Sequence, residues 1–282
     1  MDAIKCTEMW HREFLTFEYA LINPMRLDSE QWADLPVVPL HAKGFVVQSK
    51  MLPHVISLGG LSREQRIDVL ARNDSWQRVA REPLFCALLR SDAVLETLVN
   101  HFSARMVMKA PGRQKVWLRF HDPSVFTRLG WLLTDAQMRH LFGPVDAWTW
   151  FDPWAGQWRT RQRPGRGEAG AATVLDGKQW AALYRQPLLQ RCLKQMARNE
   201  GVPTAYQALA ARLDTTLQHA LILGLKDRDD ACLYALSIER HGPEWSKHFH
   251  VREAIQKARQ GEQSLVRSLS DMDETYSLPR HT

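Results

Sequence analysis

The sequence predicts an N-terminal lobe of the α/β (α+β) class with a mixed sheet, followed by an all-α C-terminal lobe. Up to about residue 160, short apolar segments of strand type alternate with amphipathic helical segments. A stretch rich in Arg, Gly and Pro follows, and beyond it only helical periodicity is found. We therefore predict an α/β lobe over residues 1–160, a linker or loop over 161–172, a helical lobe over 173–270 and a polar tail over 271–282.

Strands of the first lobe are predicted from alternation of apolar and polar residues between turn signals. Within residues 14–23 this alternation runs through Phe17, Tyr19 and Leu21 and ends at Asn23-Pro24, which predicts the first strand and turn. Further predicted strands lie at residues 45–47, 54–58, 84–89, 115–120 and 147–151.

Helices of the first lobe are predicted from N-cap residues that precede amphipathic runs. A Ser, Thr or Asp side chain at the N-cap accepts a hydrogen bond from a free backbone N–H, and a Gln three residues later completes a capping box. Proline suits the first helical position because its missing N–H has no helical partner. The predicted starts are Ser62 with Gln65, Ser91, Asp122 with Pro123, and Thr134 with Gln137.

Helices of the second lobe are predicted from apolar stripes. One stripe at helical spacing runs from Tyr206 to Gly224. A shorter helix carries Cys232 and ends near residues 241–243, where Gly and Pro follow His. A last helix is predicted over residues 251–269.

Composition indicates a folded protein that needs no disulfide or metal to be stable. The 282 residues carry 37 Lys and Arg against 31 Asp and Glu, a net charge of +6, and 45% are hydrophobic. No apolar stretch approaches the roughly 20 residues of a membrane span, and residues 1–10 lack the apolar core of an export signal. We expect a cytoplasmic protein with no membrane partner.

Nothing in the sequence indicates a metal or a cofactor. The four cysteines lie far apart and form no C-x-x-C pair, so a zinc or redox motif is not expected. Residues 165–170 match G-x-G-x-x-G, but the buried strand that a phosphate-binding loop requires before it is missing. We expect no metal site and no cofactor.

The most unusual stretch combines tryptophan with arginine. Such residues are frequent at protein interfaces, they can also stack on bases and neutralise phosphates, and tryptophan can equally fill a core. A protein-binding surface and a structural core are both open interpretations here, and nucleic-acid binding is the less favoured one. The candidate protein-binding residues are Trp148, Trp150, Trp154, Trp158, Arg159, Arg161 and Arg163.

A catalytic site is not expected from the sequence. His121 and Asp122 form a candidate acid–base pair, but Asp122 suits a helix cap better. Neither H-E-x-x-H nor G-x-S-x-G occurs. A hydrolase assembled from scattered residues is therefore the least favoured alternative.

Two short motifs carry a resemblance to a known family. Residues 117–123 read W-L-R-F-H-D-P, and residues 141–145 read L-F-G-P-V, followed by Trp148. In both, the chain resembles the type VI secretion effector chaperones, the adaptor group catalogued as domain of unknown function 4123. Residues 19–22 and 223–225 add looser similarity, whereas Asn23-Pro24 replaces the acidic residue and glycine common in the family.

The resemblance implies a non-catalytic adaptor that stays in the cytoplasm. Such a protein binds a toxin effector and promotes its loading onto the VgrG spike protein, contacting the spike directly or through the effector. The motif residues are expected to be architectural, and we assign them no binding role. They are Arg119, Phe120, Asp122, Pro123, Phe142, Gly143 and Pro144.

Overall fold

The computed structural model describes residues 2–4, 12–165, 174–201 and 206–275. The chain divides into two compact units, Met1–Trp180 and Ala181–Thr282. An antiparallel sheet with helices fills the first and helices alone form the second, so the predicted fold class is confirmed. The division falls inside α6 (Gly177–Glu200).

A sheet with the strand order β1-β9-β8-β5-β2-β4-β3 forms the centre of the first unit, and all its described pairings are antiparallel. A separate hairpin pairs β6 with β7. The strands are β1 (Asp2–Ile4), β2 (Tyr19–Ile22), β3 (Val37–Pro39), β4 (His54–Ser57), β5 (Ala87–Arg90), β6 (Val107–Lys109), β7 (Lys115–Trp117), β8 (Ala147–Asp152) and β9 (Gln157–Gln162).

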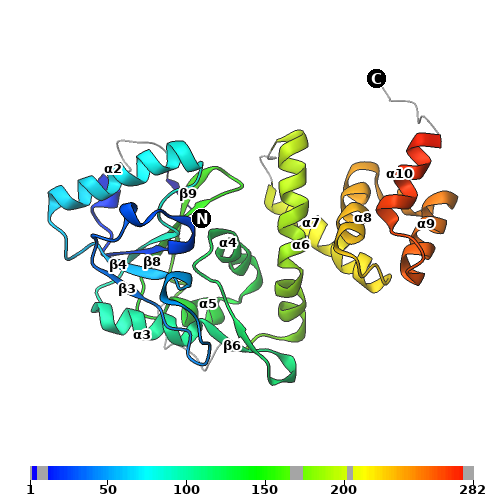
Figure 1. The fold of residues 1–282 in the computed structure, drawn as a ribbon. Coiled ribbons are helices and arrows are strands. Elements are labelled where there is room, and N and C mark those ends of the chain that lie inside the picture. Colours follow the sequence, from blue (N-terminus) through cyan, green and yellow to red (C-terminus); the bar gives the residue numbers. More distant parts are fainter. Residues whose placement is uncertain (1, 5–11, 166–173, 202–205, 276–282) are drawn as a thin grey trace. The chain divides into compact units, whose positions relative to one another are not determined.

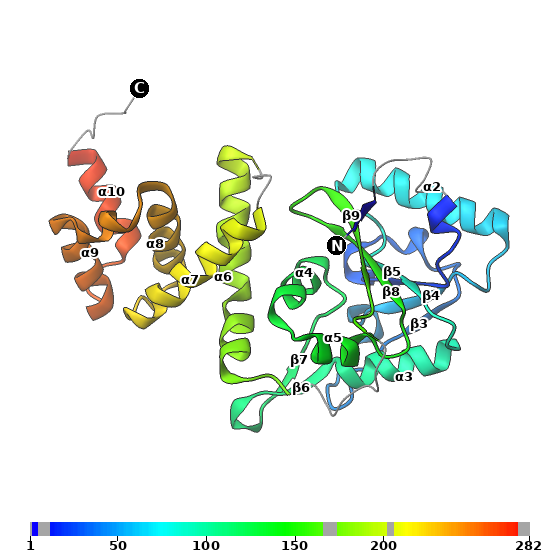
Figure 2. The same ribbon diagram turned by 180° about the vertical axis from the view of Figure 1, so that it is seen from behind.

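Helices cover both faces of this sheet, with α2 on one face and α3 and α5 on the other (Figures 1 and 2). Side chains of each strand alternate between the two faces. Ile22, Ile56 and Leu88 pack with Val69 of α2. The helices are α2 (Arg63–Ala80), α3 (Leu95–Arg105), α4 (Pro123–Leu132) and α5 (Asp135–Phe142), and the 3₁₀ turns are η1 (Pro24–Arg26), η2 (Ser29–Gln31), η3 (Ser49–Met51) and η4 (Pro111–Arg113).

Three of the four predicted helix starts in this unit are confirmed. Ser62 and Thr134 form complete capping boxes, and Asp122 accepts a hydrogen bond from the backbone N–H of Ser124. The prediction for Ser91 is wrong, because Val94 is the N-cap of α3. The Ser91 hydroxyl donates instead to the Pro144 carbonyl, 2.8 Å away, and so joins two loops.

Two other predictions in this unit need correction. Residues 45–47 form no strand, because Val46 is fully exposed and pairs with no neighbouring strand. The predicted linker starts too early, since residues 161 and 162 belong to β9. Residues 166–173 of the linker lie outside the described residues, as does most of the G-x-G-x-x-G segment.

The second unit consists of packed helices. The predicted stripe from Tyr206 is confirmed, with Leu209, Leu213 and Leu217 buried. The single helix predicted over residues 251–269 is wrong: Gly261 adopts a left-handed backbone, φ +76°, which ends one helix before the next begins. The elements are α6, α7 (Tyr206–Ile222), α8 (Arg228–His241), η5 (Pro243–Lys247), α9 (Phe249–Gln260) and α10 (Leu265–Thr275).

The predicted polar tail also begins later than residue 271, because α10 continues to Thr275, and residues 276–282 lie outside the described residues. None of the helices in the described ranges has the length and apolar character needed to cross a membrane.

Candidate functional site

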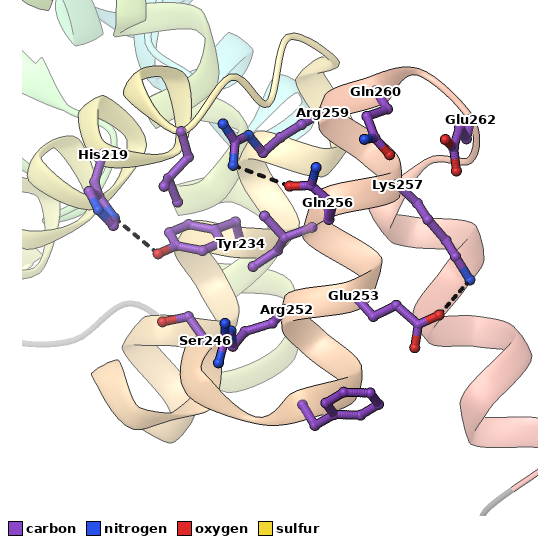
Figure 3. Close-up of a pocket in the computed structure, with 13 residues that line it drawn as sticks. His219, Tyr234, Ser246, Arg252, Glu253, Gln256, Lys257, Arg259, Gln260 and Glu262 are labelled. Atoms are coloured by element: carbon purple, nitrogen blue, oxygen red, sulfur yellow. Dashed lines mark hydrogen bonds and ion pairs between the residues drawn. The ribbon is translucent and has the colours of Figure 1, made fainter.

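A groove of about 830 Å³ opens on the helical unit (Figure 3). Residues of α7, α8, η5 and α9 line it, together with the loops that follow α7 and α9. The lining residues are His219, Leu223, Tyr234, Ser246, Phe249, Arg252, Glu253, Ile255, Gln256, Lys257, Arg259, Gln260 and Glu262.

Tight turns at helix ends create the walls of the groove. After α7 the chain reverses at Gly224, whose φ of +92° is readily adopted only by glycine. Asp227 then caps α8 by accepting hydrogen bonds from two backbone N–H groups. Gly242, with φ +81°, ends α8 and turns the chain into η5 and α9. Glycine and cap residues therefore place α9 beside α7 and α8.

An aromatic ring with a polar edge forms part of the wall. Tyr234 is buried, and its hydroxyl lies 3.0 Å from His219 Nδ1. Its ring packs edge-on against Trp245. Burial raises the pKa of the Tyr234 hydroxyl above its ordinary value of 10, so this group stays protonated and neutral at physiological pH.

Two arginines of α9 face this wall. Arg252, Gln256 and Arg259 point toward Tyr234 and His219 in Figure 3. Arg259 Nη1 donates to Gln256 Oε1 across 3.3 Å, and its side chain passes close to Gly224, so it spans the groove. None of the ion pairs found among the described residues involves Arg252 or Arg259.

The adjoining side of α9 carries a neutral ion pair. Lys257 Nζ lies 3.0 Å from Glu253 Oε1, an i, i+4 pair that points away from Tyr234 (Figure 3). At the start of α9, the Phe249 side chain is 73% exposed. The groove thus offers guanidinium groups, an exposed aromatic ring and an apolar floor formed by Leu223, Tyr234 and Ile255. This combination suits the recognition of a partner that is both anionic and apolar.

The tryptophans that the sequence singles out lie mainly in the core. Trp148, Trp150 and Trp158 are buried, which corrects their selection as protein-binding residues. Trp148 stacks on Phe126 with ring centroids 4.4 Å apart, and Trp150 Nε1 donates to Thr127 Oγ1. Rings held inside a folded core cannot stack on bases or on a partner. Trp154 is half-buried and retains an accessible surface.

The arginines of the same segment bond within the first unit and are not free contact residues. In the β8–β9 register Arg159 pairs with Trp150 and Arg161 with Trp148, so the two arginines lie on the same face of the sheet as these two tryptophans. The contacts are Arg159 Nε to Asp152 Oδ2 at 2.9 Å, Arg161 Nη1 to the Gly130 carbonyl at 2.9 Å, and Arg163 to the Gly143 carbonyl at 2.8 Å and to Asp146 at 3.1 Å.

Architectural roles explain the first family motif. Asp122 caps α4 and Pro123 takes its first position. Phe120 is buried with its ring 6.0 Å from that of Trp148. Arg119 lies 3.5 Å from Asp122 across the junction and is half-exposed.

The second motif is also architectural. Phe142 is buried at the end of α5, and the Pro144 carbonyl accepts the hydrogen bond from Ser91. Gly143 has φ +55°, and a Cβ there would lie 1.8 Å from His101 Cε1. A residue with a side chain cannot occupy this position without displacing the histidine ring.

The candidate acid–base pair is held within the fold. His121 is buried, and burial lowers the pKa of its imidazole to about 3, so the ring is neutral at physiological pH. Asp122 Oδ1 is occupied by the backbone N–H and the hydroxyl of Ser124. Across the described ranges, no group of three or more His, Cys, Asp or Glu side chains could hold a metal ion.

A second, mainly apolar cavity of about 430 Å³ lies in the first unit. Side chains of α3, β6, α4 and α5 line it, including Val107, Leu129 and Leu133. Val174 and Leu175 close one side, and Gln137 Nε2 donates to the Val174 carbonyl. This cavity carries few polar groups that could orient a ligand.

Sequence reasoning missed the groove residues Phe249, Arg252 and Arg259. Their spacing of three and seven residues places them on one face of a helix. Only the position of that helix relative to α7 and α8 distinguishes a groove wall from an ordinary solvated face.

Part of the chain matches one family model. Residues 50–140, about a third of the chain, match the family model described as "Domain of unknown function (DUF4123)". The match runs from the end of η3 through most of α5 and includes the motif at residues 117–123. The second motif at residues 141–145 and the looser similarities at residues 19–22 and 223–225 lie outside it. No curated protein and no solved structure matches the chain.

Proposed function

We propose that the protein is a type VI secretion effector chaperone, a non-catalytic adaptor that binds a toxin effector in the cytoplasm and promotes its loading onto the VgrG spike. The match of residues 50–140 to DUF4123 carries this proposal, together with the resemblance of residues 117–123 and 141–145 to the adaptor group of that name.

The proposed mechanism is stoichiometric binding. The groove of the helical unit supplies an accessible surface with an exposed aromatic ring, as a protein-binding site requires. Release of the client comes from contacts in the assembled spike that compete with those of the adaptor.

The first experiment identifies the partners. The tagged full-length protein is purified from its own cells at moderate salt, and the proteins that accompany it are identified by mass spectrometry. Recovery of a toxin or a VgrG protein in near-equal amount supports the proposal. Recovery of nucleic acid alone, or of no partner, contradicts it.

A secretion assay tests the role of the interaction. Deletion of the gene is expected to abolish export of the effector identified in this way, while export of the VgrG spike protein continues. Reintroducing the wild-type gene restores export. Normal export of the effector from the deletion strain would refute the loading role.

A further inference from the structure

We infer that the groove of the helical unit binds an acidic amphipathic helix of a partner protein, whose carboxylates pair with Arg252 and Arg259 and whose apolar side chains cover Phe249 and Leu223. The inference rests on the proposed function only in taking that partner to be the client effector.

The charge of the groove favours an acidic occupant. Arg252 and Arg259 face the groove, and no ion pair within the described ranges neutralises either of them. Of the acidic lining residues, Glu253 is paired with Lys257 and points away from Tyr234, which leaves Glu262 alone against the two arginines. Carboxylates pair with guanidinium groups in a bidentate geometry, which gives orientation as well as affinity.

The spacing along α9 favours a helical occupant. Phe249, Arg252, Gln256 and Arg259 follow one another at intervals of three and four residues and form one stripe. This spacing is typical of helices that lie side by side. The stripe extends over eleven residues, from Phe249 to Arg259, and therefore spans about 15 Å at the α-helical rise, enough for roughly three turns of a second helix.

The apolar floor favours a protein segment over a nucleic acid or a lipid headgroup. Leu223, Tyr234 and Ile255 line the groove together with the arginines. Tyr234 and Ile255 are buried, so Leu223 and the exposed Phe249 ring supply the apolar surface that a partner can reach. A phosphate backbone would satisfy the arginines but leave this apolar surface uncovered. An amphipathic helix buries both, and apolar burial contributes about 25 cal/mol for each Å².

A designed peptide tests the inference directly. The probe is a fluorescein-labelled amphipathic helix of about 18 residues with glutamates seven residues apart and leucines between them. A control peptide carries lysine in place of each glutamate. Fluorescence anisotropy with the full-length protein is expected to show binding of the acidic peptide, and the affinity of the lysine peptide should be at least about tenfold lower.

Variants locate the binding to the groove. The double substitution Arg252→Glu and Arg259→Glu is expected to weaken binding of the acidic peptide at least about tenfold. Lys226→Glu with Arg228→Glu is the matched control, because it changes the charge equally at exposed positions outside the groove lining. Circular dichroism verifies that both variants remain folded.

Equal binding of the two peptides, or undiminished binding by the Arg252 and Arg259 variant, overturns the inference. The inference is also overturned if the acidic peptide does not bind, while single-stranded DNA or anionic vesicles bind to the wild type and not to the Arg252 and Arg259 variant. If the effector co-purifies equally with wild type and variant, the proposed function stands and the groove is not its site. If the peptide binds as expected but no effector co-purifies, the inference stands and the proposed function fails.

Discussion

Gly143 shows how one residue can decide a junction. It ends α5 with φ +55°, and an added Cβ would lie 1.8 Å from the His101 ring. We expect Gly143→Ala to lower the free energy of unfolding by about 2–4 kcal/mol, because backbone strain and overpacking add. Gly156→Ala is the control, since Gly156 has φ +62° but open space around it, and should cost only about 1 kcal/mol. Equal shifts of the two urea midpoints would contradict this explanation.

Two histidines, the half-buried His101 and the buried His121, make stability depend on pH. Burial lowers the pKa of His101 to about 4 and that of His121 to about 3, whereas an unfolded chain binds these protons near pH 6.5. Because the folded pKa is the lower one, stability is complete above pH 6.5 and is lost as the pH falls toward 4. Each pKa unit corresponds to about 1.4 kcal/mol.

We therefore expect the urea midpoint of the wild type to fall between pH 7 and about pH 4.5. His101→Gln can still donate to the Leu141 carbonyl, which lies 2.9 Å from His101 Nε2, but it does not titrate. Its midpoint should decline less steeply over the same range. Identical slopes for the two proteins would rule out His101 as a source of the pH dependence.

At the scale of elements, the β8–β9 hairpin is joined by a buried ion pair. The Asp152 carboxylate is fully buried, lies 2.9 Å from Arg159, and accepts hydrogen bonds from the backbone N–H groups of Trp154 and Ala155. Removing one member of a buried pair leaves a charge without compensation. The turn also loses the acceptor that orders its backbone.

We expect Asp152→Ala to lower the free energy of unfolding by about 3–5 kcal/mol. Asp146→Ala serves as the comparison, because Asp146 pairs with Arg163 at the surface of the same hairpin, and it should cost at most about 1 kcal/mol. Urea denaturation of both variants measures the difference. A small effect of Asp152→Ala would show that the hairpin is stabilised mainly by its aromatic packing.

At the scale of the whole molecule, each compact unit has its own core. In the helical unit Leu213 is fully buried, and Leu213→Ala is expected to cost about 2–5 kcal/mol through the cavity that it leaves. Hydrogen exchange should accelerate in α7 and α8 and remain unchanged in β2, β5 and β8. Equal acceleration in the sheet would mean that the two cores unfold as one cooperative unit.

The sequence by itself determined several local elements of this protein. The capping boxes at Ser62 and Thr134, the cap at Asp122 and the stripe from Tyr206 were all predictable, because each depends on residues within a few positions of one another. The fold class followed from the change of periodicity near residue 160. The helix end at Gly261 was also encoded locally, by a glycine within a polar stretch, but the prediction of one helix over residues 251–269 overlooked it.

Only the tertiary structure decided which of these residues are accessible. In the sequence, Trp148 and Trp150 are candidates for a protein interface. The position of β8 in the sheet and the packing of α4 against it place both tryptophans in the core. Arg252 and Arg259 look like an ordinary solvated face, but the approach of α9 to α7 and α8 makes them a groove wall. Both outcomes depend on contacts between residues far apart in the chain, and local periodicity carries no information about such contacts.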